Sequence, residues 1–265
     1  MRRYFSPSWA AVWLLAITVI ALAAPLIAPY NPRLPILAAL SPAGDGTLLG
    51  TDALGRDLLS RLIYGARYSL LSSLAATLIT LTIGLALGLL ASSSSGLLDR
   101  LLLALANAGL AIPGLLLAML FVAGIGPGLP TVVLAVGLGG SPGFVRLARS
   151  VFKSLLQEGY IDAARALGAG RVRIALLHLL PNAMPQLVAL ATTHYAWAFL
   201  GTTTLTFLGL AGDPALPEWG AMLDAGRTYL IQAPILSLLP GTLITLTVLA
   251  VHRAGMGLKT ASRPG

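Results

Sequence analysis

The chain of 265 residues is 57% hydrophobic and only 10% charged, whereas an average soluble domain is about 45–50% apolar and about 25% charged. A soluble domain of this size would need more charge to cover its surface, and a disordered chain would be less apolar. Because the chain has no Cys, a disulfide framework and thiolate metal sites are excluded as well. The composition therefore predicts a polytopic membrane protein.

Six segments are long and apolar enough to cross a bilayer, which requires about 20 mostly apolar residues. In chain order they are residues 9–28, 69–91, 101–123, 129–145, 187–208 and 231–251. Gly84 and Gly88 in the second segment have the GxxxG spacing that lets helices pack closely. Pro113 predicts a kink in the third segment.

The charges predict on which side of the membrane each connection lies. With the N-terminus in the cytoplasm and six alternating spans, twelve Lys and Arg residues fall inside and five outside, as the positive-inside rule describes. Both termini are then cytoplasmic. The start of the chain has a second interpretation, because Arg2, Arg3, an apolar run and Ala21-Leu22-Ala23 are typical of a cleaved signal peptide. Cleavage would leave five spans.

The cytoplasmic connection at 146–186 is too charged to span and too apolar to be a plain loop. We divide the chain into residues 1–68, an N-terminal span with an outer segment, and residues 69–265, a five-helix core that carries this connection. One helical face of the connection holds Ile161, Ala164 and Leu167, and the opposed edge holds Glu158, Asp162 and Arg165. The pattern predicts an amphipathic helix over about 155–167, ended by Gly168 and Gly170. Such a helix either inserts into a groove of another protein or lies on the membrane surface.

Residues 49–70, LGTDALGRDLLSRLIYGARYSL, precede the second span. Asp52 with Arg56, and Asp57 with Arg61, have the i,i+4 spacing with the acid first that stabilises a helix. Together with Arg67, these charges predict an interfacial helix on the outer side of the membrane. A docking role and a plain surface role both remain open for it.

The sequence shows no catalytic or metal-binding constellation. The three His residues lie in separate segments without metal-ligand spacing, and neither Lys153 nor Lys259 belongs to a P-loop. Residues 139–143 match the GxSxG pattern of hydrolases, but Pro142 follows the Ser and lacks the N–H that an oxyanion hole uses. His194 alone lies within a span. It is either part of a translocation path or a neutral His bonded to a neighbouring carbonyl or hydroxyl, with Thr192 and Thr193 nearby in the sequence.

The connection at 146–186 also carries a motif. Asp162-Ala163-Ala164, three residues, Gly168, nine residues and then His178-Leu179-Leu180-Pro181 resembles the EAA loop of the permease subunits of ATP-binding-cassette importers. The family pattern is Glu-Ala-Ala, three residues, Gly, nine residues and Ile-x-Leu-Pro, so this chain departs from it at Asp162 and His178. The segment at 49–70, and Trp219-Gly220 followed by Met222-Leu223, are similar to the second permease subunit of the oligopeptide, dipeptide and nickel branch.

The resemblance implies an all-α integral membrane protein with six transmembrane helices and a cytoplasmic EAA-type coupling helix that docks into an ATPase subunit. Gly159 and Gly168 would let the coupling helix pack closely, and Pro181 would break the chain before the fifth span. The residues that the resemblance assigns to ATPase coupling are Glu158, Gly159, Asp162, Ala163, Ala164, Arg165, Gly168, Arg171, Leu180 and Pro181.

The implied partners are a homologous permease subunit that completes a heterodimer, two ATP-binding-cassette ATPase subunits, an extracytoplasmic solute-binding protein and membrane lipid. ATP would bind to the partner subunits, so no cofactor and no metal are expected on this chain, and no nucleic acid is expected as a partner. We expect a non-catalytic permease subunit in the inner (cytoplasmic) membrane of a prokaryote.

Its expected cargo is peptides, with nickel or another small solute as the alternative within the same class. A stand-alone channel or secondary carrier is the alternative from another class. The predicted spans carry no Asp, Glu, Lys or Arg, which disfavours an ion-coupled carrier.

Overall fold

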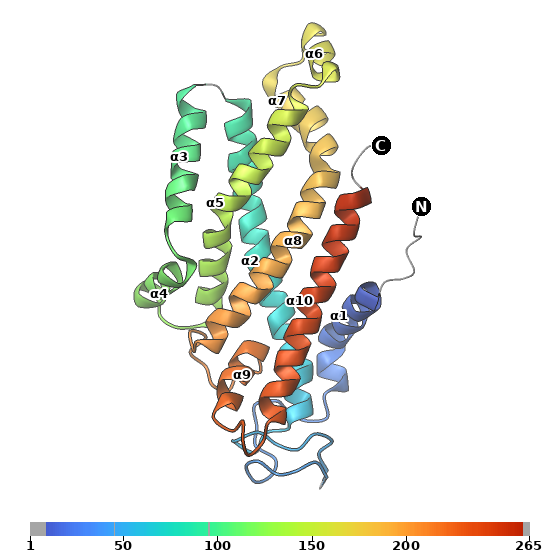
Figure 1. The fold of residues 1–265 in the computed structure, drawn as a ribbon, viewed down its shortest axis with the longest axis vertical. Coiled ribbons are helices and arrows are strands. Elements are labelled where there is room, and N and C mark those ends of the chain that lie inside the picture. The colour runs from blue at the N-terminus through green and yellow to red at the C-terminus, as the bar shows by residue number, and fades with distance from the viewer. Residues whose placement is uncertain (1–8, 45, 95, 262–265) are drawn as a thin grey trace.

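The computed structural model describes residues 9–44, 46–94 and 96–261, with side chains up to residue 257. The long helices run roughly along the long axis of the molecule (Figure 1), and the described residues contain no strand, only isolated backbone bridges. The helices are α1 (Trp9–Ile27), α2 (Leu58–Ser93), α3 (Leu97–Ala111), α4 (Gly114–Ile125), α5 (Leu129–Leu155), α6 (Gly159–Ala166), α7 (Arg171–Arg173), a π-helical segment (Ile174–Leu179), α8 (Leu180–Phe207), α9 (Trp219–Arg227) and α10 (Ile235–Ala261).

The structure confirms the all-helical membrane fold but changes the third span. Five continuous helices in the described residues are long and apolar enough to cross a membrane, and the pair α3 and α4 makes a sixth candidate that is bent by 88°. Pro113 disfavours the helical conformation at the preceding residue, and Ile112 is accordingly extended at φ −84° and ψ 119°. Instead of the predicted kink within one helix, one helix ends here and a second begins in another direction.

The predicted outer interfacial helix at 49–70 is wrong. Residues 49–57 are irregular, and α2 begins at Leu58 and continues for 36 residues. The side chain of Asp57 accepts a 2.7 Å hydrogen bond from the backbone N–H of Ser60, so it caps the helix at this point. Residue 68, where we divided the chain, lies inside α2.

The connection at 146–186 also differs from its prediction. Residue 155, predicted to start the amphipathic helix, is the last residue of α5, and α6 begins only at Gly159 after a turn at 156–158. The predicted chain break at Pro181 is wrong, since one helix runs from Arg171 to Phe207. At the other end of the chain, α10 begins at Ile235, directly after Pro234, rather than at residue 231.

The packing of α2 against α5 depends on glycine, as the GxxxG spacing predicted. A Cβ atom added to Gly84 would lie 2.7 Å from the Phe144 ring, and one added to Gly88 would lie 2.8 Å from the Ala148 Cβ. On the facing helix, a Cβ at Gly137 would lie 2.8 Å from the Ile79 Cβ. The two backbones are thus as close as side chains permit, and a Cβ at any of these positions would force them apart.

We therefore expect Gly88→Leu to destabilise the fold by about 1–3 kcal/mol, as overpacking does in a filled core. Gly124→Leu in α4 is the matched control, because a Cβ there meets no atom within 4 Å. The measurement is the thermal unfolding midpoint in detergent. Equal midpoints for the two variants would contradict the close approach of α2 and α5.

Candidate functional site

At one end of the molecule α6 stands beyond the ends of α5 and α8 (Figure 1). Its inner face is anchored, because Ile161 is fully buried in an apolar cluster with Phe152 of α5 and Leu179 of the π-helical segment. Ala164, on the same face, is 9% exposed. One side of α6 is therefore held against the bundle, and the side chains on its other side face outward.

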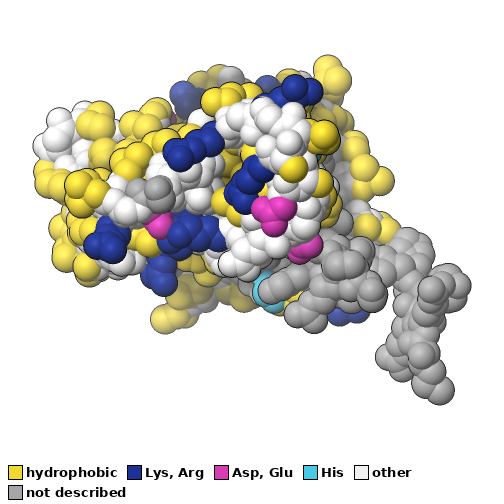
Figure 2. Space-filling view, turned by 90° about the horizontal axis from the view of Figure 1, so that it is seen from above, with side chains coloured by type: hydrophobic (Ala, Val, Ile, Leu, Met, Phe, Trp, Pro, Cys, Tyr) yellow, Lys and Arg dark blue, Asp and Glu magenta, His cyan; other side chains and the backbone are white. Residues whose placement is uncertain are grey.

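The outward side of this region is partly apolar. Ile161, Ala164 and Leu167 were predicted to share one apolar face that another protein or the membrane could receive, and the structure divides this face. Ile161 and Ala164 are buried against the bundle, whereas Leu167 is 89% exposed because α6 ends at Ala166. Val172 is 72% exposed nearby in the sequence. Seen from this end, Lys and Arg side chains surround the α6 region and acidic side chains are fewer (Figure 2). Asp162 and Arg165 form an exposed 2.9 Å ion pair on α6.

Gly168 ends α6 by its backbone conformation. Its φ of +83° lies in the left-handed region, which glycine adopts without a steric cost. The N–H of Ala169 donates to the Ala164 carbonyl at 3.0 Å and that of Gly168 to Arg165 at 2.9 Å, as in a glycine-terminated helix end. A Cβ at Gly159 or Gly168 would meet no atom of this chain within 4 Å. Close packing of another protein against these two glycines therefore stays a prediction.

The end of the EAA-like segment lies within a continuous helix. Pro181 has no N–H to donate to the preceding turn, and the π-helical segment directly before α8 widens the helix at this point. The side-chain amide of Asn182 donates a 2.6 Å hydrogen bond to the His178 carbonyl. Leu180 packs at the edge of the apolar cluster that holds Ile161, and Arg171 is exposed at the start of α7.

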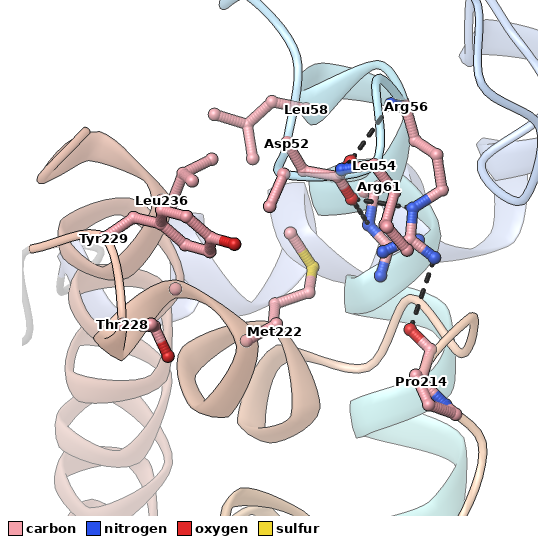
Figure 3. Close-up of a pocket in the computed structure, with 13 residues that line it drawn as sticks. Asp52, Leu54, Arg56, Leu58, Arg61, Pro214, Met222, Thr228, Tyr229 and Leu236 are labelled. Carbon is pink, nitrogen blue, oxygen red and sulfur yellow. Dashed lines mark hydrogen bonds and ion pairs between the residues drawn. The ribbon is translucent and has the colours of Figure 1, made fainter. Parts of the chain in front are cut away.

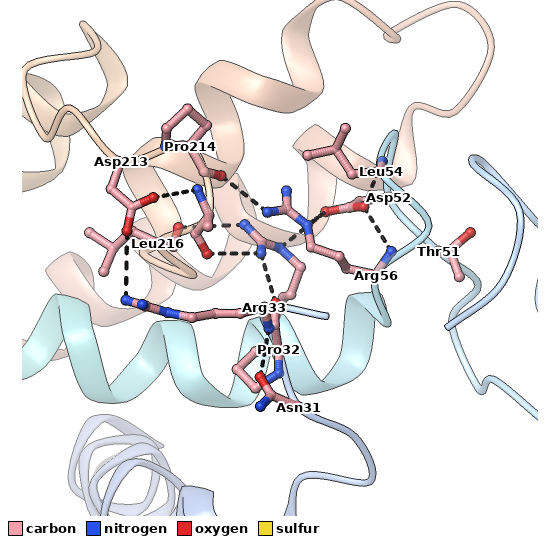
Figure 4. A network of polar contacts seen from close by, with 12 residues as sticks. Asn31, Pro32, Arg33, Thr51, Asp52, Leu54, Arg56, Asp213, Pro214 and Leu216 are labelled. Atoms are coloured by element: carbon pink, nitrogen blue, oxygen red, sulfur yellow. Dashed lines mark hydrogen bonds and ion pairs between the residues drawn. The ribbon is translucent and has the colours of Figure 1, made fainter. Parts of the chain in front are cut away.

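At the opposite end a polar network, which we call the outer clasp, joins Asp52, Arg56 and Arg61 (Figure 4). Asp52 Oδ2 lies 2.7 Å from Arg56 Nε and 3.2 Å from Arg61 Nε. The predicted Asp52–Arg56 pair is thus present. The predicted Asp57–Arg61 pair is wrong, because Asp57 caps α2 and Arg61 turns to Asp52 instead.

The same two arginines hold backbone from distant parts of the chain. Arg61 Nη1 donates to the carbonyl of Pro32 at 2.9 Å and to that of Ala215 at 3.2 Å, and Arg56 Nη1 donates to Pro214 at 3.2 Å. Both guanidinium groups are nearly inaccessible, at 5% and 2% exposure. The outer clasp therefore fixes the start of α2 against the connection between α8 and α9.

A pocket of about 250 Å³ adjoins the outer clasp (Figure 3). Its polar side is formed by Asp52 and Arg56, and Met222, Tyr229 and Leu236 lie across from them. Arg67, which we grouped with these charges from the sequence, does not line this pocket. It lies further along α2 and lines a different cleft.

Sequence reasoning missed Glu218, which is fully buried at the start of α9. Ser69 Oγ of α2 donates to it at 2.6 Å, Thr206 of α8 is a second partner, and the Ala221 N–H donates at 3.0 Å. Burial raises the pKa of the Glu218 carboxyl, against the hydrogen bonds from Ser69 and Thr206, which lower it. The signal available in the sequence was an acidic residue directly before Trp219-Gly220, where a short helix begins.

A second group that sequence reasoning missed lies toward the α6 end. Asp99 of α3 accepts two 2.6 Å hydrogen bonds from Arg149 of α5, and its Oδ2 lies 2.7 Å from Lys153 Nζ. This cluster ties α3 to the inner half of α5 and leaves one net positive charge. Ser141, the residue of the GxSxG match, is buried and donates to the Gly137 carbonyl at 2.8 Å.

His194 lies in the middle of α8 against Gly140 of α5. Its predicted bond to Thr192 or Thr193 is not made, since both hydroxyls donate to the Ala189 carbonyl, and the buried Nε2 has no partner in the described residues. Its ring lies 5.3 Å from that of Trp197. Trp197 in turn lines an apolar groove of about 550 Å³ between the α3–α4 bend, α5 and α8. His194 therefore lies behind the wall of this groove.

These features together define a polytopic helical membrane component with one protruding helix and one polar, braced end. The chain belongs to the family of binding-protein-dependent transport system inner membrane components, whose model matches residues 80–256. The resemblance seen in the sequence is thereby confirmed.

Three relatives show where in that family the chain lies. It is 43% identical over 96% of its length to the di/tripeptide transport system permease protein DppC of Pseudomonas aeruginosa, covering 86% of that protein. It is 39% identical over 82% of its length to the glutathione transport system permease protein GsiD of Pectobacterium atrosepticum, covering 72% of that protein. It is 35% identical over 96% of its length to the dipeptide transport system permease protein DppC of Haemophilus influenzae, covering 88% of that protein.

The fold has a solved counterpart. The inward-facing MetNI methionine ABC transporter contains a chain that matches with a TM-score of 0.63 at 22% identity, over 77% of this chain and 97% of that one. The helical arrangement described above is therefore that of a known membrane transport subunit.

The burial of Glu218 predicts a pH-dependent stability. Because the folded pKa is raised above 4.5, this group adds stability at low pH, and that contribution is lost as the pH rises through the raised pKa. Glu218→Gln should therefore flatten the decline of the unfolding midpoint with rising pH. The control is Asp224→Asn, at a partly exposed position on the same helix. A wild-type slope in Glu218→Gln would contradict the raised pKa.

Proposed function

We propose that this chain is the non-catalytic permease subunit of an ATP-driven importer of peptides. The named relatives are permeases for di/tripeptides, glutathione and dipeptides, which share a short peptide as cargo, and this supports a peptide rather than nickel here. The observation that carries the mechanism is α6, which is anchored through Ile161 and exposes Leu167 beyond the bundle.

In this mechanism an ATPase subunit receives α6, with Leu167 and Val172 as its apolar contacts and Asp162, Arg165 and Arg171 at the rim. Docked apolar side chains supply affinity, and rim charges orient the partner. Ile161 joins α6 to α5 and to the start of α8 in one apolar cluster, so a displacement of α6 is passed to both helices. ATP binds to the partner subunits, and this chain holds no cofactor of its own.

The proposed orientation places α6 and both termini in the cytoplasm. The basic surroundings of α6 (Figure 2) support it, because Lys and Arg concentrate on cytoplasmic segments. An extracytoplasmic solute-binding protein then meets the end that carries the outer clasp. A homologous permease subunit completes the translocation path as a heterodimer, with the groove between the α3–α4 bend, α5 and α8 on the path side and His194 behind its wall.

We expect Leu167→Asp to release the ATPase subunits, because a charge would have to be buried in their apolar docking site. Ile231→Asp is the matched control, since Ile231 is 99% exposed at the opposite end of the molecule. The measurement is co-purification of ATPase subunits from the membranes of the native host. Retention of the ATPases by Leu167→Asp, at the level of Ile231→Asp, would contradict the docking role of α6.

The cargo is tested by uptake into proteoliposomes that contain the complete transporter with its binding protein and ATP. We expect uptake of labelled dipeptides and tripeptides, competition by glutathione to the extent that its peptide backbone is recognised, and no uptake of Ni²⁺. Liposomes that contain this chain alone should take up nothing. Uptake by the chain alone would identify a stand-alone carrier, and uptake of Ni²⁺ without peptide would identify a nickel transporter.

A further inference from the structure

A third cavity lies between α1, α2, α8 and α10, on the side of the molecule away from the α3–α4 bend (Figure 1). Its volume is about 410 Å³. The walls are mostly apolar and include Leu14, Leu22, Leu70, Leu71, Leu74 and Val251. We call this cavity the α1 cleft. In the described structure α1 is the outermost of these four helices (Figure 1), so the cleft lies at the periphery of the bundle.

Arg67 is the only charged residue among the described ones that line the α1 cleft. Among the described residues, no carboxylate lies within ion-pair distance of its guanidinium group, and it makes no hydrogen bond to the protein. The other partly or fully buried arginines differ, since Arg56, Arg61 and Arg149 each lie within 3.2 Å of a carboxylate oxygen. A charge beside an apolar cavity is costly unless it is paired. The described part of the fold supplies a carboxylate to each of the other three arginines but none to Arg67.

Apart from Arg67, the cleft is lined by three polar side chains, those of Thr18, Thr192 and Tyr195, and the last two are satisfied within the protein. The Thr192 hydroxyl donates to the Ala189 carbonyl at 2.9 Å, and the Tyr195 hydroxyl donates to the Leu70 carbonyl at 3.3 Å. A ligand with many polar groups, such as a peptide, would find few partners here, and its unpaired groups would oppose binding. The cleft instead offers one cation and a long apolar wall.

Along α2, Arg67 lies between the outer clasp and the apolar run of the helix. It lies six residues after Arg61 of the outer clasp, which corresponds to about 9 Å along the helix, and two residues before the apolar run at 69–91. Tyr64 and Tyr68 are close to it in the sequence, and aromatic residues of this kind mark the boundary between membrane and water. We therefore expect the guanidinium group to lie near the boundary between the apolar part of the membrane and its headgroups.

We propose that the α1 cleft binds a phospholipid, whose headgroup phosphate pairs with Arg67 while one acyl chain lies along the apolar walls. The phosphodiester supplies the anion that the fold does not, and its oxygens match the donor geometry of a guanidinium group. The acyl chain fills the cleft with apolar surface. The bound lipid would hold α1 against the other helices, so the site is a structural feature of the outer half of the membrane. It does not depend on which solute is transported.

The test is native mass spectrometry of the full-length chain in the assembly that it forms in its own membrane, delipidated and then titrated with phosphatidylglycerol. We expect one tightly bound phospholipid per copy of the chain, and Arg67→Gln should weaken its binding about tenfold. Arg67→Lys should restore most of the affinity because it keeps the charge. Arg33→Gln, at an exposed outer position, is the matched control and should bind as the wild type does.

Two further ligands separate the parts of the proposal. Diacylglycerol has the acyl chains without the phosphate, and inorganic phosphate has the anion without the chains, so neither should displace the bound lipid at the concentration at which phosphatidylglycerol does. Equal displacement by diacylglycerol would show that Arg67 plays no part, and equal displacement by inorganic phosphate would show a soluble-anion site. Either result, or undiminished lipid binding by Arg67→Gln, would overturn the proposal.

Discussion

In a bilayer, apolar side chains gain little by exchanging lipid for another helix, so long helices stay together through close van der Waals contact. Here α2 and α5 make that contact, where Gly84, Gly88 and Gly137 remove the side chains that would separate them. The consequence extends beyond the pair, because α2 also packs on α1, α8 and α9. The arrangement of the other helices therefore depends on how closely these two approach.

The two ends of the molecule are joined to this pair by different kinds of interaction. At the α6 end the joint is apolar, since Ile161 is buried among residues of α5 and the π-helical segment. At the other end it is polar, since Arg56, Arg61 and the Ser69–Glu218 hydrogen bond hold the α8–α9 connection against the start of α2. An apolar joint tolerates sliding and reorientation, whereas a hydrogen-bonded one fixes geometry. This difference suits the proposed function, in which the α6 end passes on the movement of an ATPase subunit and the opposite end keeps its geometry.

The spans could be predicted because an apolar run long enough to cross the bilayer is typical of a transmembrane helix. The glycine spacing on α2 was informative for the same reason. The details that failed depend on competition between local and distant partners. Asp57 could pair with Arg61 by spacing, but the free N–H of Ser60 at the helix start is closer and Arg61 has Asp52 and three carbonyls to reach. Pro181 was expected to break the chain. Instead, the π-helical turn before it accommodates the backbone hydrogen bond that proline cannot donate.

By itself, the sequence determined that this is a helical membrane protein, that its connection at 146–186 contains an amphipathic helix, and that it belongs to this family. Apolar length and motif spacing are properties of the chain. Only the tertiary structure decided that Leu167 faces outward and that α3 and α4 meet at 88°. It also decided that, within the described part of the chain, hydrogen-bond donors surround Glu218 whereas Arg67 has no acceptor. Exposure and pairing depend on which distant segments arrive beside a residue. Local spacing carries no record of that.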